Sequence, residues 1–137
     1  MKTVHKIIGL FGGVNKFPPL RIENEPHRVL CIERIGKGPH WRPLVSVKHT
    51  TGLVPDPELV CEVYPDGRWL PVSYRNGIDG VLVEVNAAPT DRPADVHLDV
   101  RVHLRNFANK WDAILGSERY FAAAVDQLNT AAVAECA

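Results

Sequence analysis

The chain has 137 residues, 45% of them hydrophobic and 23% charged, and 16 basic residues balance 16 acidic ones, so the formal net charge is zero with the six histidines neutral. This composition is that of an ordinary globular protein and excludes a disordered, collagen-like or coiled-coil chain. No stretch reaches the roughly 18 consecutive apolar residues of a membrane-spanning helix, so we expect residues 1–137 to form one domain without a membrane partner.

The first predicted element is a short helix with Thr3 as its N-cap. Its apolar residues recur at the i, i+3, i+4, i+7 spacing of one helical face, namely Val4, Ile7, Ile8 and Phe11. Gly12 and Gly13 end the helix. Alternating apolar and β-branched residues then predict strands at residues 20–23, 28–35, 44–48, 59–64, 68–74 and 81–85.

The strands at residues 59–64 and 68–74 form the clearest hairpin, because Pro65-Asp66-Gly67 between them has turn chemistry. Pro71 has no amide hydrogen to donate to a neighbouring strand. The second strand is therefore predicted to run along an edge of the sheet or to carry a bulge at Pro71.

Residues 96–104 fit two patterns. Apolar and polar residues alternate strictly there, as in a half-buried strand. A helical face also runs through Val96, Val100, Leu104, Phe107 and Trp111. The β-branched content favours a strand up to Leu104, followed by a helix that Gly116 ends.

A last helix is predicted after Gly116, with Ser117 as its N-cap and a buried stripe of Phe121, Ala124, Val125 and Leu128. Helices at both chain ends around a run of strands predict an α+β fold. We expect a largely antiparallel sheet of about five or six strands, with the N-terminal and C-terminal helices packed on one face.

The charge is divided along the chain. Residues 1–52 hold nine basic and three acidic residues, whereas residues 53–99 hold nine acidic and three basic ones. The two halves either form separate binding faces or pair with each other in one sheet. Pairing of opposite charges across strands is common, and it favours the second arrangement.

The loop after the strand at 28–35 combines glycines with cations and an indole. These features are typical of a site for phosphate or single-stranded nucleic acid, where cations neutralise the backbone and a ring stacks on a base. The residues of this alternative are Arg34, Lys37, His40, Trp41, Arg42 and Lys48. Because the spacing of a phosphate-wrapping motif is missing, an ordinary hairpin loop with Trp41 anchored in the core is the favoured interpretation.

The strand at 68–74 offers a second candidate surface. Arginine and aromatic residues are enriched in binding hot spots, and four such residues gather here: Arg68, Trp69, Tyr74 and Arg75. An edge position would expose them to a protein partner. The competing interpretation is that Trp69 packs against the terminal helices.

Two polar groups are candidates for catalysis or metal binding. One is the alternating face of the predicted strand at 96–104, with His97, Asp99, Arg101 and His103, and the other is the pair Asp56 and Glu58. A metal site needs three or four convergent ligands, which neither group shows. We therefore assign no catalytic and no metal-binding residue, and we expect no cofactor.

The three cysteines, Cys31, Cys61 and Cys136, form no C-x-x-C motif, and their odd number leaves one unpaired. Cys31 and Cys61 lie in apolar strands, where a cysteine behaves as a small buried hydrophobe, and Ser46 and Ser73 lack a nucleophile elbow. A reducing, cytoplasmic location is expected, since the apolar run near the N-terminus is interrupted by glycines and lacks a signal-peptide cleavage site.

Several motifs follow one another along residues 4–76: Phe11-Gly12-Gly13, residues 19–24, 32–36 and 44–49, Asp56-Pro57-Glu58, and residues 69–76. In this order they resemble a family of small uncharacterised bacterial proteins carried by plasmids, phages and integrative elements. Phe107 and Trp111 match a later aromatic helix of that family. The resemblance implies no assigned chemistry, and it implies a setting in mobile DNA.

We expect a non-enzymatic binding protein of a mobile genetic element that acts on a host protein complex, for example as an anti-defence protein. The alternative is a nucleic-acid-binding accessory protein that uses the basic N-terminal half. The third hypothesis is a small metal-dependent enzyme. The sequence does not indicate the oligomeric state of the protein under any of these hypotheses.

Overall fold

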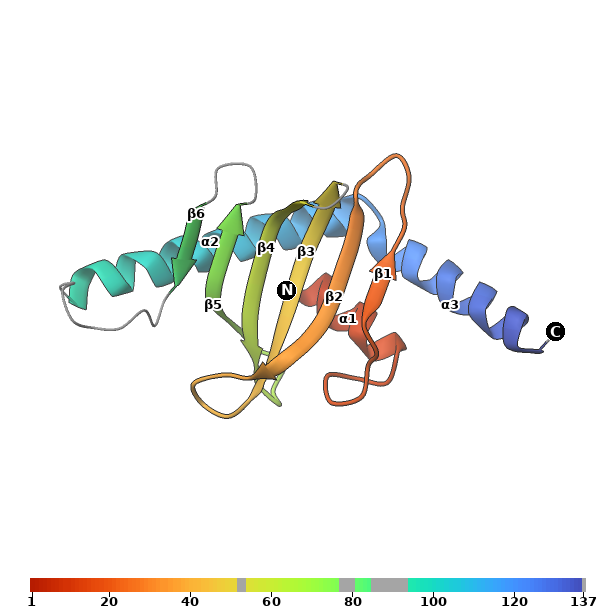
Figure 1. Ribbon diagram of the computed structural model, residues 1–137, viewed down its shortest axis with the longest axis horizontal. Coiled ribbons are helices and arrows are strands. Elements are labelled where there is room, and N and C mark those ends of the chain that lie inside the picture. Colours follow the sequence, from red (N-terminus) through yellow and green to blue (C-terminus); the bar gives the residue numbers. More distant parts are fainter. Residues whose placement is uncertain (52–53, 77–80, 85–93, 137) are drawn as a thin grey trace.

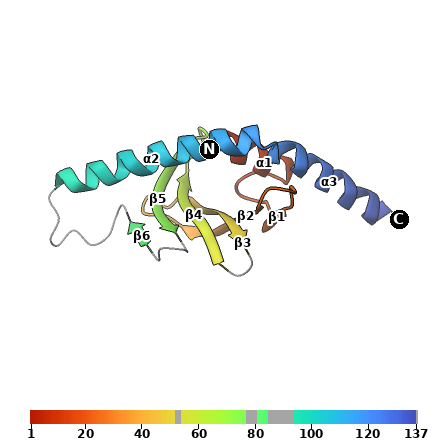
Figure 2. The same ribbon diagram turned by 90° about the horizontal axis from the view of Figure 1, so that it is seen from above.

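A computed structural model describes residues 1–51, 54–76, 81–84 and 94–136, and it describes side chains within residues 1–50, 57–75 and 101–129. A six-stranded antiparallel sheet has its three helices on one face, and α3 continues outward beyond β1 at the edge of the sheet (Figures 1 and 2). The elements are α1 (Lys2–Leu10), β1 (Leu20–Ile22), β2 (Val29–Lys37), β3 (Pro43–Thr51), β4 (Val54–Val63), β5 (Trp69–Asn76), β6 (Val81–Glu84), α2 (Ala94–Ser117) and α3 (Tyr120–Cys136). The predicted α+β fold is confirmed.

The strands lie in the sheet in the order of the chain, from β1 to β6, and each pair of neighbours is antiparallel. The basic strands β1–β3 and the acidic strands β4–β6 therefore form adjacent halves of one sheet. They meet where Lys48 of β3 lies opposite Glu58 of β4. Across the next strand pair, Glu58 also lies opposite Arg75.

The core lies between the sheet and the helices. Strand residues two positions apart point to the same face, so β2, β3 and β4 each send alternate apolar side chains to the helix side. These residues are Leu30, Ile32, Val45, Val47, Leu59, Cys61 and Val63, all buried. The helices contribute Val4, Ile7, Ile8, Trp111, Leu115, Tyr120 and Ala124 to the same cluster.

Helix α1 begins at Lys2, two residues earlier than predicted, with Met1 at the N-cap position. The prediction of Thr3 as N-cap is wrong. The amide of Thr3 instead donates a hydrogen bond of 2.9 Å to Oδ1 of Asp112 in α2. A carboxylate at the start of a helix satisfies an unpaired amide and complements the helix dipole, so this contact fastens α1 to α2.

Strand β5 carries the predicted bulge. Val60 of β4 lies opposite Ser73, but the next residue, Cys61, lies opposite Pro71, so Val72 is the extra residue. The edge position that Pro71 also suggested is wrong, because β5 lies between β4 and β6. The extra residue changes the alternation, and Trp69 and Tyr74 both pack against the core instead of pointing to opposite faces.

The strand predicted over residues 96–104 is wrong, because these residues belong to α2. The helical pattern is decisive: Leu104, Ala108, Trp111 and Leu115 are all buried, at spacings of four, three and four residues. The β-branched residues near its N-terminal end lower helix propensity only weakly, and tertiary packing overrides such a preference.

The boundary between the last two helices also differs from the prediction. Ser117 is the last residue of α2, and its hydroxyl donates to the carbonyl of Ile114 instead of capping α3. Arg119 turns the chain with a φ of 65°, and α3 begins at Tyr120. Among the side chains of α3 that the structure describes, Tyr120 and Ala124 are buried, Val125 and Leu128 are half-buried, and Phe121 is exposed. Tyr120 anchors the helix by donating its hydroxyl hydrogen to the carbonyl of Arg28.

Candidate functional site

The loop between β2 and β3 folds into a compact turn with an exposed indole at its tip. The amide of Gly38 donates to the carbonyl of Arg42 at 2.8 Å, and the amide of Trp41 donates to the carbonyl of Gly38 at 3.0 Å. Trp41 has a φ of 61° and is 80% exposed. The expectation that Trp41 anchors the loop in the core is therefore wrong. Left-handed backbone is costly for a bulky residue, so the hydrogen bonds of the turn have to hold Trp41 in this conformation.

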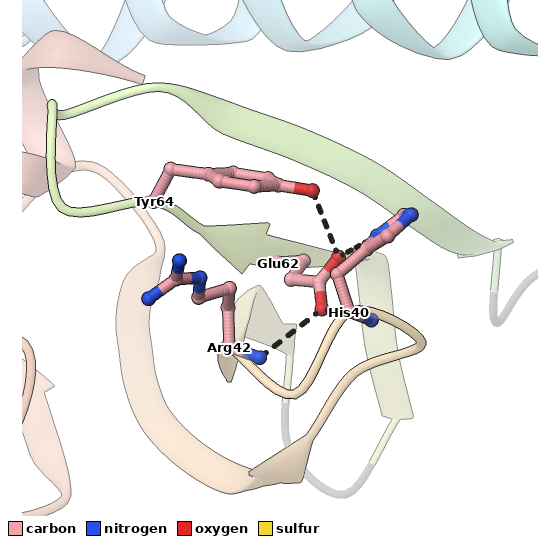
Figure 3. Close-up of polar contacts among 4 residues, drawn as sticks. All are labelled: His40, Arg42, Glu62 and Tyr64. Atoms are coloured by element: carbon pink, nitrogen blue, oxygen red, sulfur yellow. Dashed lines mark hydrogen bonds and ion pairs between the residues drawn. The ribbon is translucent and has the colours of Figure 1, made fainter.

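A buried carboxylate holds this loop in place (Figure 3). Glu62 of β4 lies between Cys61 and Val63, which face the helices, so its side chain points to the other face of the sheet. The loop covers it there, and the Glu62 side chain is 0% exposed. Its Oε2 accepts the amides of His40 at 2.8 Å and Arg42 at 3.3 Å.

The other carboxylate oxygen of Glu62 is also bonded. Oε1 lies 2.7 Å from Nδ1 of His40, and the hydroxyl of Tyr64 lies 3.5 Å from the same oxygen (Figure 3). Burial raises the pKa of Glu62, but the hydrogen bonds from the ring and amide of His40 and from the amide of Arg42 outweigh it. The net pKa lies below the ordinary 4.5. Glu62 is therefore ionised at neutral pH and accepts hydrogen bonds from two residues of the loop, His40 and Arg42.

Gly38 allows the loop to approach this carboxylate. A Cβ atom at Gly38 would lie 2.5 Å from Oε2 and 2.7 Å from Cδ of Glu62. A real Cβ does not come so close, and the carboxylate is fixed by its partners. Any residue with a side chain at this position would therefore displace the loop or Glu62.

In their neutral forms, His40 of the loop and His5 of α1 have opposite tautomers. Because a carboxylate only accepts hydrogen bonds, the Nδ1 atom of His40 carries the proton, and Nε2 is an acceptor in the neutral ring. Indole nitrogen only donates, and Nε1 of Trp69 lies 3.1 Å from Nδ1 of His5, so neutral His5 carries its proton on Nε2. The His40 ring, whose centroid lies 6.2 Å from that of Tyr64, thus offers an acceptor, and the His5 ring offers a donor in the lining of the cleft beside Tyr64 and Trp41 described next.

A cleft of about 360 Å³ lies next to the loop. Charged and aromatic residues line it, namely His5, Lys37, Trp41, Arg42 and Tyr64, together with Val14, Asn15, Pro43, Val63 and Pro65. The guanidinium groups of Arg42 and Arg68 lie 6.0 and 5.1 Å from the centroid of the Tyr64 ring. We call the residues Lys37, His40, Trp41, Arg42 and Tyr64 the Trp41 site.

The structure brings together most of the residues predicted for nucleic acid. Lys37, Trp41 and Arg42 line the cleft, and His40 lies beside them on the loop. Arg34 is held next to the cleft by the carbonyl of Asn15, with its guanidinium 5.5 Å from the Phe17 ring centroid. Lys48 is not part of the site, because it lies along β3 with its Nζ 4.0 Å from Glu33.

The residues predicted for a protein partner on β5 do not form one exposed surface. Trp69 packs against the core and bonds to His5 of α1, which agrees with the competing interpretation. The Tyr74 ring lies 4.8 Å from that of Phe107 in α2. Only Arg68 and Arg75 of this set are exposed, and Arg68 is paired with Asp66 at 2.7 Å.

We expect Trp69→Ala to lower the free energy of unfolding by about 3 kcal/mol, because it removes a large ring from the contact between α1 and β5. Urea denaturation measures this change. Trp41→Ala is the matched control, since it removes the same side chain from an exposed position. An unchanged unfolding midpoint for Trp69→Ala would show that the ring does not support the fold.

The catalytic candidates gain no support within the described residues. No group of three or more metal-ligating side chains converges in that part of the chain. Glu58 accepts the hydroxyl of Ser46 at 3.0 Å, and burial raises the pKa of Cys61 to about 12, which makes it a poor nucleophile. The side chains of Asp56, His97, Asp99 and Cys136 lie outside the described residues.

Residues 101 and 103 are on the helix α2 and not on a strand face. Arg101 and His103 are both exposed there. Residues two apart on a helix point in different directions, so the shared face predicted for them is wrong.

None of the helices in the described parts of the chain has the length and apolar content to span a membrane.

The chain belongs to the family described as a domain of unknown function, DUF6908, whose model matches residues 2–121. The match spans α1, the sheet and α2 and ends at the start of α3. No curated protein and no solved structure matches the chain.

Proposed function

We propose that this protein binds single-stranded nucleic acid at the Trp41 site. The observation that carries this proposal is the exposed indole of Trp41, which a fixed loop holds beside two cations, Lys37 and Arg42. An unpaired base has an open ring face on which an indole stacks, whereas the bases of a duplex are already stacked on one another. The cations then contact the phosphates on either side.

The buried carboxylate supports the same proposal. Glu62 fixes the loop by three hydrogen bonds to His40 and Arg42, so the site exists before a ligand arrives. A preformed site loses less conformational entropy on binding than a mobile loop does. The negative charge of Glu62 is covered by the loop and does not repel a phosphate from the surface as an exposed carboxylate would.

Binding to single-stranded oligonucleotides should fall steeply with salt, because each phosphate contact releases counterions. We expect Lys37→Ala and Arg42→Ala each to reduce the slope of log K against log salt by about one. Fluorescence anisotropy of labelled oligo(dT), oligo(rU) and a duplex over a range of NaCl concentrations measures this. The exposed Arg105 of α2, on the helix side of the molecule, provides the matched control Arg105→Ala.

Failure of the wild type to bind any of these oligonucleotides at low salt would overturn the proposal.

In that case we propose a second function. The protein would be a non-enzymatic, cytoplasmic protein of a bacterial mobile element, and it would bind a host protein complex with Trp41 as the anchor. Trp, Tyr and Arg are the residue types most enriched in hot spots, and Trp41, Arg42 and Tyr64 lie together here. A host complex retained by the wild type and lost by Trp41→Ala would support it.

A further inference from the structure

The imidazole of His40 and the carboxylate of Glu62 form a fixed pair. Nδ1 of His40 lies 2.7 Å from Oε1 of Glu62, and the amide of the same histidine donates to Oε2 at 2.8 Å. The histidine is therefore held at two points by a carboxylate that is itself 0% exposed. In enzymes that use such a pair, the carboxylate keeps the proton on Nδ1, orients the ring and stabilises the imidazolium that forms when the other nitrogen takes up a proton.

The second ring nitrogen of His40 is not used by the fold. Nε2 makes no hydrogen bond within the described residues, and the side chain is 59% exposed. Figure 3 shows the ring with this nitrogen directed away from Glu62. Because Nδ1 carries the proton, Nε2 of the neutral ring has a lone pair that can accept a proton from a bound ligand.

The neighbours of His40 are suited to a phosphate backbone. Trp41 follows it directly, with a Cα–Cα distance of about 3.8 Å, so a strand whose base stacks on the indole passes close to the imidazole. Arg42, whose amide also donates to Glu62 at 3.3 Å, and Lys37 supply two positive charges. Cations beside a proton acceptor favour transfer of a phosphoryl group, because they stabilise the charge that develops on its oxygens in the transition state.

We propose that the Trp41 site cleaves RNA, with His40 as the general base. This inference rests on the nucleic-acid proposal and narrows the ligand to RNA, because only RNA carries the 2′-hydroxyl that His40 would deprotonate. Glu62 acts as the positioning residue, since it contacts the histidine and the loop and not the strand.

The reaction is a transesterification within one RNA strand. Nε2 of His40 takes the proton of a 2′-hydroxyl, and the 2′ oxygen forms a bond to the adjacent phosphorus. The bond from that phosphorus to the 5′ oxygen of the next nucleotide breaks. Water gives a proton to this 5′ oxygen, and the hydroxide that remains takes the proton from Nε2. The products are a 2′,3′-cyclic phosphate and a 5′-hydroxyl end, so atoms and charges balance.

A labelled oligo(dU) that contains one ribouridine tests the proposal. We expect the wild type to cut this strand only on the 3′ side of the ribouridine, and mass spectrometry should find a 2′,3′-cyclic phosphate there. The all-deoxy strand should be bound and left uncut. His40→Asn keeps an N–H donor for Glu62 near the position of Nδ1 and removes Nε2. It should slow cleavage by about 100-fold or more, the usual contribution of a general base, and change the affinity little.

His103→Asn is the matched control. His103 is exposed on α2 and does not line the cleft, so this variant should cut at the rate of the wild type. Anisotropy measures binding in the same samples, and the thermal midpoint shows whether each variant is folded. If His40→Asn does not fold, the comparison of the two strands still decides, because it removes the nucleophile from the substrate.

The possible failures of the two proposals can be told apart. Equal cleavage by the wild type and a folded His40→Asn would overturn this inference and indicate a contaminating nuclease. A strand with ribouridine that is bound but not cut, or an all-deoxy strand that is cut, would also overturn it and leave the nucleic-acid proposal in place. Absence of binding to every strand would overturn both.

Discussion

Replacing Trp41 by alanine is expected to weaken the binding of single-stranded oligonucleotides by about 5- to 150-fold, because base stacking on an aromatic ring contributes about 1–3 kcal/mol. The thermal midpoint should not change, since the indole is 80% exposed and forms no part of the core. Anisotropy titrations at one fixed salt concentration measure the affinity, and a thermal melt of the same sample measures the stability.

The variant Trp41→Phe tests whether stacking on any aromatic ring is sufficient or whether the indole ring is required. A smaller aromatic ring still stacks on a base, so this variant should retain an affinity between those of the wild type and Trp41→Ala. Equal affinity of Trp41→Ala and the wild type would show that the exposed indole is not the contact. The nucleic-acid proposal would then lose the observation on which it rests.

The second large effect concerns Glu62. Glu62→Gln keeps the shape of the side chain but replaces one accepting oxygen by an NH₂ group, which faces the amides of His40 and Arg42 or the proton on His40 Nδ1. A hydrogen bond to a charged group contributes about 1.5–3 kcal/mol, so we expect the free energy of unfolding to fall by at least that amount at pH 7. Urea denaturation at pH 7 measures the loss.

The pH dependence of stability gives an independent measurement of the same residue. The pKa of Glu62 is lower in the folded chain than the ordinary 4.5, so its stabilising effect is complete above that value. The effect is lost as the pH falls below 4.5 through the pKa of the folded state, because the unfolded chain binds the proton more tightly. The difference in stability between the wild type and Glu62→Gln should therefore shrink below pH 4.5. A difference that is constant from pH 7 to pH 3 would contradict this assignment.

The sheet could be predicted from the sequence because its signals are local. Alternation in β2, β3 and β4 and the turn at Pro65-Asp66-Gly67 depend on neighbouring residues only. The start of α2 could not be predicted in this way, since the same residues fit both periods. The contact that decides between them is the packing of Leu104, Ala108 and Trp111 against elements far away in the chain.

Only part of the Trp41 site could be predicted from the sequence. The cations and the indole of the loop are close together in the sequence, and this pattern indicates a candidate binding site for nucleic acid. Glu62 was missed, because it looks like the outward-facing member of an alternating strand. The only available signal was a charged residue between Cys61 and Val63, and nothing local shows that a loop 20 residues earlier covers it.

The arrangement of α1 has a consequence for folding during synthesis. Every strand of the sheet bonds to its neighbour in the chain, so each hairpin can close over a short loop as soon as it is made. Thr3 instead bonds to Asp112, 109 residues further along the chain. Helix α1 is therefore synthesised long before Asp112, and its apolar face, with Val4, Ile7 and Ile8, lacks the contact with α2 until the chain has emerged past that residue. During that time this face of the growing chain stays open to chaperones.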